Sequence, residues 1–189
     1  MLAARKGHFR LESGHHGDLW LDLDLVFLRP SHVRRFVVEL ADRLSRYNLA
    51  AVCGPLVGGA LVAQAVAFEL DVEFYYTERF LPPQPNVLYP VEYRIPNGLR
   101  KRVRGKDIAI VDDVINAGSA VRGTLAELRS CGARPVAIGA LLVLGSLAPS
   151  FFADQHIHLE SLASRASGLW APTECPLCAS QTPLEDVAA

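Results

Sequence analysis

Leucine occupies every second position between residues 19 and 25, and acidic residues fill most of the positions between them. This two-residue period predicts a half-buried strand. From Ser31, the expected N-cap, apolar residues recur every three or four positions and predict a helix that ends at Asn48. A short apolar run at 49–53 predicts a buried strand. The next helix, 60–70, is apolar on nearly every side and is expected to pack inside.

The same alternation continues through the second half of the chain. Apolar runs predict strands at 72–76, 108–111 and 135–144, and a helix at 120–130 is closed by Gly132. Strands that alternate with helices predict an α/β fold with a largely parallel central sheet flanked by helices. Because ligands in such sheets bind beyond the carboxyl ends of the strands, functional residues are expected there.

Two segments depart from this alternation. Residues 79–104 hold five of the twelve prolines. From 149 to 189 the pattern predicts an irregular C-terminal tail, apart from a short helix near 159–166. At roughly 150 residues per domain, the 189 residues are expected to form a single domain, 1–189, with its core at 31–148.

Composition and charge exclude several classes of protein. Half of the residues are hydrophobic and 21% are charged, which excludes disorder and supports a sizeable core. The formal net charge of −1 gives no reason to expect nucleic acid or an anionic membrane as a partner. No apolar run reaches the roughly 18–20 residues of a membrane span. Residues 8–18 are polar where a signal peptide would be apolar, so a cytoplasmic protein is expected.

The most informative segment is the end of the strand at 108–111 and the turn that follows it. Asp112 and Asp113 repel each other at the end of a buried strand unless a cation or hydroxyl donors face them, and the vicinal hydroxyls of a sugar would satisfy both. The small-residue turn 116–120 brings backbone N–H groups to a helix N-terminus, where they can bind phosphate. The segment therefore predicts a ribose-5-phosphate site. The alternative is an ordinary strand-turn-helix connection with a satisfied aspartate pair.

This segment closely resembles the phosphoribosyl pyrophosphate (PRPP) signature of the type I phosphoribosyltransferases. The resemblance implies that Mg²⁺, bound with PRPP, lies at Asp112 and Asp113, which hold the ribose in catalysis. It also implies a PRPP site made of the following residues: Asp112, Asp113, Val114, Ile115, Asn116, Ala117, Gly118, Ser119 and Ala120.

Two further segments extend the resemblance over most of the chain. The turn at 53–60 looks like the family's pyrophosphate loop, which implies diphosphate contacts at Leu56, Val57, Gly58 and Gly59. The opening Phe9-x-Leu11-x-Ser13-Gly14 resembles that of orotate phosphoribosyltransferases. The family fold implies a small hood formed by residues 1–30, and the family also implies a homodimer.

The residues that would bind orotate depart from the family pattern. His16 stands where those enzymes have a lysine, Asn116 where they have a threonine, and Gly145-Ser146 where an arginine pairs with the orotate carboxylate. The segment 79–104 lacks the loop motif that carries their catalytic lysine, and the sequence does not decide whether this loop acts in cis or across a dimer. The resemblance implies transfer of the ribose-5-phosphate of PRPP to a nitrogenous base with release of diphosphate. The departures indicate that this base need not be orotate and leave its identity open, with His16, Asn116 and Ser146 as candidate base contacts.

Other functions remain open at this point. The main alternative is a PRPP-sensing regulatory protein that binds nucleic acid through the basic segment 100–106. The same cations can instead attract a diphosphate or form a solvated surface.

A weaker alternative is a zinc-linked dimer or assembly factor. Cys175 and Cys178 have the spacing of two zinc ligands, which His156 and His158, or a second copy of the pair, can complete. The plainer interpretation is two thiols in a compact turn.

Overall fold

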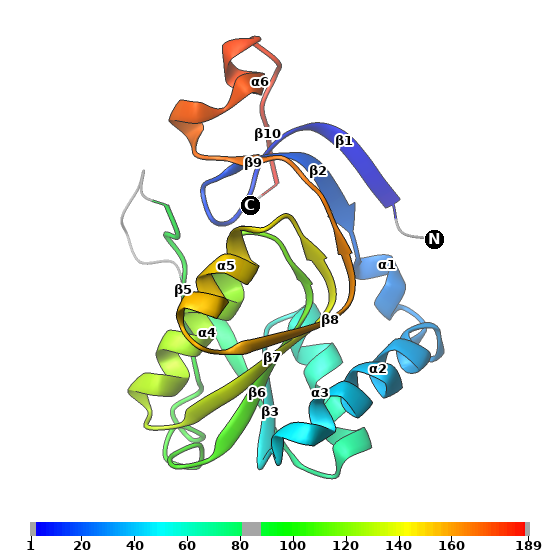
Figure 1. The fold of residues 1–189 in the computed structure, drawn as a ribbon, viewed down its shortest axis with the longest axis vertical. Helices are drawn as coiled ribbons and strands as arrows, with labels where there is room; N and C mark the ends of the chain where they lie inside the picture. The colour runs from blue at the N-terminus through cyan, green and yellow to red at the C-terminus, as the bar shows by residue number, and fades with distance from the viewer. Residues whose placement is uncertain (1–2, 81–87, 188–189) are drawn as a thin grey trace.

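A six-stranded sheet forms the centre of the protein in a computed structural model that describes residues 3–80 and 88–187 (Figure 1). All neighbouring strands of this sheet are parallel except β5, which runs antiparallel to β4. In spatial order the strands are β5 (Glu92–Arg94), β4 (Glu73–Phe80), β3 (Ala51–Pro55), β6 (Asp107–Ile115), β7 (Arg134–Leu144) and β8 (His158–Arg165). The α/β fold with a largely parallel sheet is confirmed.

Helices cover both faces of the sheet. On one face lie α2 (Pro30–Leu44) and α3 (Gly58–Leu70), and on the other lie α4 (Ser119–Ser130) and α5 (Leu147–Asp154) (Figure 1). The central strand β6 contributes side chains to the hydrophobic core on each face of the sheet. Ile108 and Ile110 pack with α4, whereas Ala109 and Val111 pack with α2 and α3. This double burial explains why the strand is a continuous apolar run instead of an alternating one.

A second, four-stranded sheet forms a hood above the carboxyl ends of the central strands (Figure 1). Its strands are β10 (Glu185–Asp186), β1 (Ala3–Arg10), β2 (His16–Asp22) and β9 (Leu169–Trp170). The expected N-terminal hood is thus present, but the C-terminal segment supplies both of its edge strands. The remaining short elements are α1 (Asp24–Phe27), η1 (Ser45–Tyr47), η2 (Pro172–Glu174) and α6 (Pro176–Ala179).

The irregular tail expected at 149–189 is the largest error of the sequence analysis. The segment 159–166, expected as a helix, lies in β8 up to Arg165, and β8 pairs in parallel with β7. Pairing with an existing strand outweighs the intrinsic preference of these residues. The helix α5 was also missed; its Pro149 lies in the first turn, where a proline is tolerated.

Two details of the helices also differ from expectation. Ser31 is not the N-cap of α2; Arg29 is, and Pro30 takes the first helical position, where its fixed φ suits the helix. The helix α3 is not buried on every side, since Leu61 and Phe68 on its outer face are 43% and 82% exposed. No helix among the described residues is long and apolar enough to cross a membrane.

The helix α5 is expected to stabilise the core through Phe152, which is fully buried. Phe152→Ala should lower the free energy of unfolding by about 3–5 kcal/mol. The same change at the exposed Phe68 should cost less than about 0.5 kcal/mol. Urea denaturation measures both values, and equal effects of the two substitutions would contradict the packing of α5.

Candidate active site

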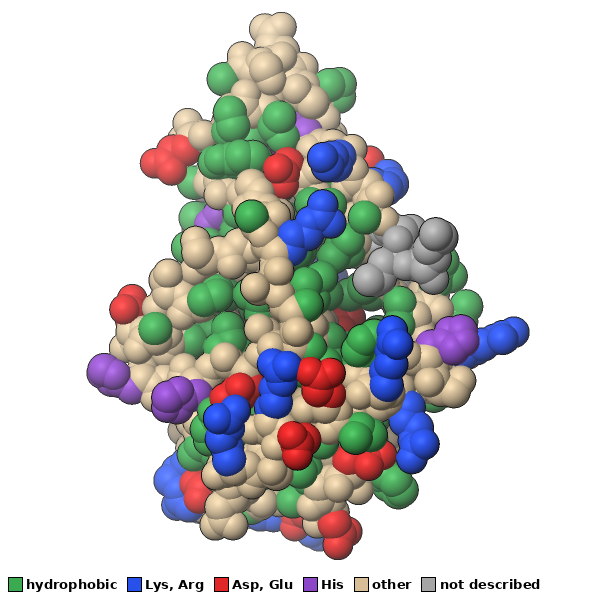
Figure 2. Space-filling model, turned by 45° about the vertical axis from the view of Figure 1, so that its right-hand side comes forward, with side chains coloured by type: hydrophobic (Ala, Val, Ile, Leu, Met, Phe, Trp, Pro, Cys, Tyr) green, Lys and Arg blue, Asp and Glu red, His purple; other side chains and the backbone are tan. Residues whose placement is uncertain are grey.

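A cavity of about 490 Å³ lies between the hood and the carboxyl ends of the central strands. Figure 2 shows the corresponding hollow between the narrow upper part of the molecule and its wider body. The hood contributes Leu19, Trp20 and Leu21 to the lining, and the core contributes the turns that follow β3 and β6. The cavity therefore lies where the sheet topology predicts a ligand site.

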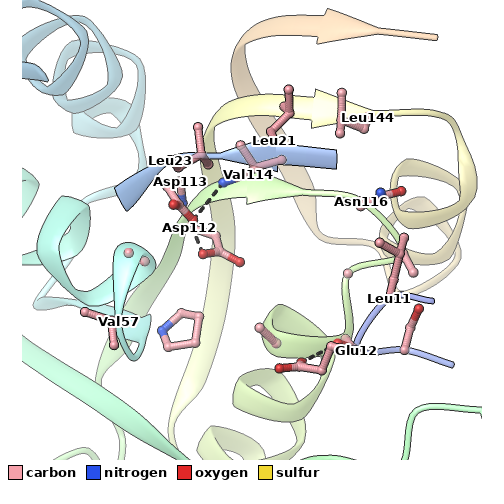
Figure 3. A pocket seen from close by; sticks show the side chains of 18 of the residues that line it. Leu11, Glu12, Leu21, Leu23, Val57, Asp112, Asp113, Val114, Asn116 and Leu144 are labelled. Carbon is pink, nitrogen blue, oxygen red and sulfur yellow. Dashed lines mark hydrogen bonds between the residues drawn. The ribbon is translucent and has the colours of Figure 1, made fainter. Parts of the chain in front are cut away.

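The acidic pair forms one wall of this cavity (Figure 3). It lies inside β6 because the strand continues to Ile115, four residues beyond the expected end. The Asp113 N–H donates to Asp112 Oδ1 over 3.0 Å, and the Val114 N–H donates to Asp113 Oδ1 over 2.9 Å. Burial, and then the neighbouring charge of Asp113, raise the pKa of Asp112 well above its usual value.

This donor set suits a hard divalent cation or sugar hydroxyls. Both Asp112 and Asp113 offer carboxylate oxygens to the cavity, and oxygen ligands are those that Mg²⁺ prefers. Either a cation or hydroxyl donors would offset the repulsion between the two carboxylates. The residues present therefore fit the Mg²⁺ that the resemblance implies.

The turn between β6 and α4 forms a second wall. Gly118, the N-cap of α4, has φ of 78°, a left-handed conformation that favours glycine. The turn leaves the first N–H groups of a twelve-residue helix without helical partners, as an anion site requires. Asn116 lines the cavity, and its buried Oδ1 has no hydrogen-bond partner among the described residues.

The glycine turn after β3 faces the acidic pair at close range. A Cβ atom added to Gly59 would lie 2.5 Å from Asp112 Oδ1, and one added to Gly58 would overlap the Asp113 carboxylate. Any side chain at Gly58 or Gly59 would therefore collide with the carboxylates in their present positions. Leu56 and Val57, joined by a cis peptide bond, also line the cavity. The three motifs that the sequence singled out thus meet in one place.

Glu12 is a cavity residue that the sequence analysis missed. The turn after β1 carries it into the cavity, where Ser119 Oγ donates to its Oε1 over 2.6 Å. The Tyr93 hydroxyl donates to Oε1 over 2.9 Å, and Arg79 Nε lies 3.3 Å from Oε2. Burial, followed by the charge of Glu12, raises the pKa of Tyr93. One indication of this role was present in the sequence: Glu12 directly precedes Ser13-Gly14 in the opening segment that resembles orotate phosphoribosyltransferases.

Two of the three candidate base contacts lie outside the cavity lining. His16 is buried in the hood with its Nδ1 3.0 Å from His8 Nε2, and Ser146 is an exposed residue at the N-cap of α5. Only Asn116 lines the cavity. Neither His16 nor Ser146 is therefore placed to contact a base in this cavity.

The basic segment 100–106 lies far from these groups. It precedes β6, so it lies at the amino edge of the sheet, opposite the cavity. Arg100 pairs with Glu127, and Lys106 pairs with Glu73. Its position argues against a role in attracting a diphosphate to the cavity, whereas Lys101, Arg102 and Arg104 are exposed, so nucleic-acid binding stays an untested alternative. Part of the loop 79–104, residues 81–87, lies outside the described residues.

Comparison with known proteins agrees with this geometry. The chain is similar to an orotate phosphoribosyltransferase from Caldanaerobacter subterraneus subsp. tengcongensis, with 28% identity over 179 residues that cover 95% of this chain and 87% of that protein. It is similarly related to an orotate phosphoribosyltransferase from Thermotoga maritima, with 28% identity over 189 residues that cover 97% and 90% of the two chains.

Solved structures share the fold. The orotate phosphoribosyltransferase of Aeropyrum pernix superposes with a TM-score of 0.63 at 22% identity, covering 86% of this chain and 88% of that chain. The adenine phosphoribosyltransferase of Thermoanaerobacter pseudethanolicus gives a TM-score of 0.63 at 19% identity, covering 78% and 88%. The family model of the phosphoribosyl transferase domain matches residues 30–149, the stretch that holds the acidic pair, the phosphate turn and the glycine turn. The chain therefore belongs to the phosphoribosyltransferase family and is an enzyme of that class.

Proposed function

We propose that the cavity binds PRPP with Mg²⁺ and transfers its ribose-5-phosphate to a base that carries no carboxylate. The observation that supports this most is the meeting of the acidic pair, the phosphate turn and the glycine turn around one cavity. In this proposal Asp112 and Asp113 accept hydrogen bonds from the ribose hydroxyls. The turn 116–120 binds the 5-phosphate, and the backbone of 56–59 approaches the diphosphate.

The reaction exchanges one bond at the anomeric carbon. A nitrogen of the base donates its electron pair to C1 of the ribose, the bond from C1 to the diphosphate oxygen breaks, and the diphosphate leaves with that electron pair. The proton of the base nitrogen passes to water. Mg²⁺, when bound to the diphosphate, neutralises the charge of this leaving group. The carboxylates of Asp112 and Asp113 supply negative potential beside the ribose, where positive charge develops.

The charge of the cavity disfavours an anionic base. Three carboxylates line it, those of Glu12, Asp112 and Asp113, and Arg79 is the one cation among the described lining residues. Arg79 is already engaged, since its Nε lies 3.3 Å from Glu12 Oε2. A carboxylate on the base would lack an unengaged cation and would face like charge.

Glu12 is instead suited to a base that presents N–H donors. An ionised carboxylate accepts up to about four hydrogen bonds. When the 5-phosphate takes the Ser119 hydroxyl, Oε1 of Glu12 becomes available to such a donor. Trp20 from the hood offers an aromatic surface on which a planar base can stack, and Asn116 lines the same cavity.

The homodimer and the cytoplasmic location expected from the sequence stay predictions. Multi-angle light scattering of the purified chain would test the homodimer.

Asp112 and Asp113 should be required for PRPP binding, but their charges should lower the stability of the folded protein. Asp112→Asn keeps an oxygen that can accept the Asp113 N–H and removes one buried charge. Loss of the charged contact should weaken PRPP binding in the presence of Mg²⁺ by about 10–100-fold, measured by calorimetry. Asp107→Asn, at the half-buried start of the same strand and outside the cavity lining, is the matched control and should leave binding unchanged.

The stability of these variants should depend on pH in a defined direction. Because burial raises the pKa of Asp112 in the folded state, folded protein binds the proton more tightly than unfolded protein. Wild-type stability should therefore fall as pH rises from the ordinary carboxyl pKa towards the raised value, and that of Asp112→Asn should not. The variant should be at least as stable as wild type at neutral pH in thermal unfolding. Wild-type PRPP affinity in this variant would contradict the role of the pair.

Orotate should be a poor substrate. The missing cationic partner and the like charges should lower kcat/KM for orotate by at least about 100-fold relative to the best base. Diphosphate release measured over a panel of purine and pyrimidine bases gives this ratio. A kcat/KM for orotate in the ordinary range, about 10⁵ M⁻¹ s⁻¹, would show that the base site is misread.

Glu12 should decide which base is accepted. Glu12→Gln keeps the side-chain shape and removes the charge, so kcat/KM for the best base should fall by about 10–100-fold while that for orotate does not fall. Glu92→Gln, an exposed glutamate on β5, is the matched control. An equal fall for every base would show that Glu12 acts on PRPP or on the fold instead of on the base.

A further inference from the structure

Four side chains that can bind a transition metal meet in the hood, outside the residues that line the cavity. His8 lies on β1 and His16 begins β2, while Cys175 precedes α6 and Cys178 lies within it. The candidate ligand atoms all lie within 4.8 Å of one another. His8, His16 and Cys175 are buried, and Cys178 is exposed. The partners expected from sequence, His156 and His158, are not part of this cluster.

Four of the six distances between these atoms are close to those of a tetrahedral site, and all six are within 4.8 Å. Zinc bonds of about 2.3 Å to sulfur and 2.0–2.1 Å to nitrogen place neighbouring ligands about 3.3 Å apart for two nitrogens and about 3.6 Å for nitrogen and sulfur. The two imidazole nitrogens, His8 Nε2 and His16 Nδ1, lie 3.0 Å apart. Cys178 Sγ lies 3.2 Å from His16 Nδ1 and 3.7 Å from His8 Nε2. Cys175 Sγ lies 3.4 Å from His8 Nε2.

A hydrogen bond outside the cluster orients one of the imidazoles. His8 Nδ1 lies 2.8 Å from the Thr182 carbonyl oxygen, which can only accept. Nδ1 therefore carries the proton, and in the neutral ring Nε2 presents its lone pair to the two thiols and to His16. Metal-binding histidines are commonly held in this way by a backbone carbonyl.

The C-terminal segment has little else to hold it in place. Between residues 171 and 187, Cys175 is the one buried residue. The flanking strands β9 and β10 pair with the hood over two residues each. The ion pairs of β10 with Arg5 and Arg10 are exposed, and such pairs contribute little stability. A segment without its own apolar core needs another source of stability.

We propose that His8, His16, Cys175 and Cys178 bind one Zn²⁺ ion that fixes the C-terminal segment to the N-terminal hairpin. Two sulfur and two nitrogen ligands in tetrahedral arrangement favour zinc over harder cations. Four protein ligands leave no position open for substrate, so the site is structural. Both thiols lose their protons on binding, and the two thiolates balance the charge of the ion. The site does not depend on the identity of the base.

Metal content tests the proposal directly. The purified chain, kept reduced with a phosphine and incubated with Zn²⁺ before dialysis, should retain about one zinc ion per chain in elemental analysis. Cys178→Ser should weaken Zn²⁺ binding by at least about 100-fold in a chelator competition. Because Cys178 is exposed, this substitution does not disturb a packed core. Cys131→Ser and His158→Gln, which change a cysteine and a histidine outside the cluster, should bind Zn²⁺ as wild type does.

Cobalt gives a second measurement. Co²⁺ bound in place of Zn²⁺ should show the strong visible absorption of tetrahedral coordination and a thiolate charge-transfer band, both lost in Cys178→Ser and in His16→Gln. Removal of Zn²⁺ with a chelator should make residues 171–187 sensitive to protease while the circular dichroism of the core stays unchanged.

Three results would overturn the proposal. The first is wild-type protein that retains no zinc and shows no cobalt spectrum. The second is Zn²⁺ bound equally well by wild type and Cys178→Ser. The third is a disulfide between Cys175 and Cys178 in protein alkylated at the moment of cell lysis.

Discussion

Electrostatic repulsion between the buried carboxylate of Asp112 and the half-buried carboxylate of Asp113, at the end of β6, constrains the whole ligand-binding edge of this protein. Asp112 and Asp113 lie on a strand that is covered on both faces, so water cannot fully solvate them. The turn opposite them has no side chains at Gly58 and Gly59, because any Cβ there would meet a carboxylate. The fold thus keeps two carboxylates together at a cost in stability. A bound cation and sugar hydroxyls would offset their repulsion, and such a loss of stability is common at active sites.

The local parts of this site could be predicted from the sequence. The strand at 108–111, the acidic pair and the turn 116–120 follow one another in the chain, and their chemistry depends on neighbours in sequence. The helices α2, α3 and α4 were also predicted, because each shows its period or its apolar run within a few turns.

The parts that could not be predicted depend on distant contacts. The strand β8 carries leucines at a helical spacing, and only its pairing with β7 makes it a strand. Glu12 meets Ser119 across more than a hundred residues, so its role cannot be read from its neighbours. The histidines nearest to Cys175 in sequence, His156 and His158, were the natural partners to consider, whereas folding brings His8 and His16 beside it.

The hood sheet also sets the order in which the protein can be completed during synthesis. Its central strands β1 and β2 leave the ribosome before the core sheet, but its edge strands β9 and β10 leave after it. A two-stranded hairpin alone is at best marginally stable in water. The hairpin of β1 and β2 therefore lacks its neighbouring strands until some 150 further residues have been made. The core can fold as a unit in that interval, so the hood above the active-site cavity is completed only after the core.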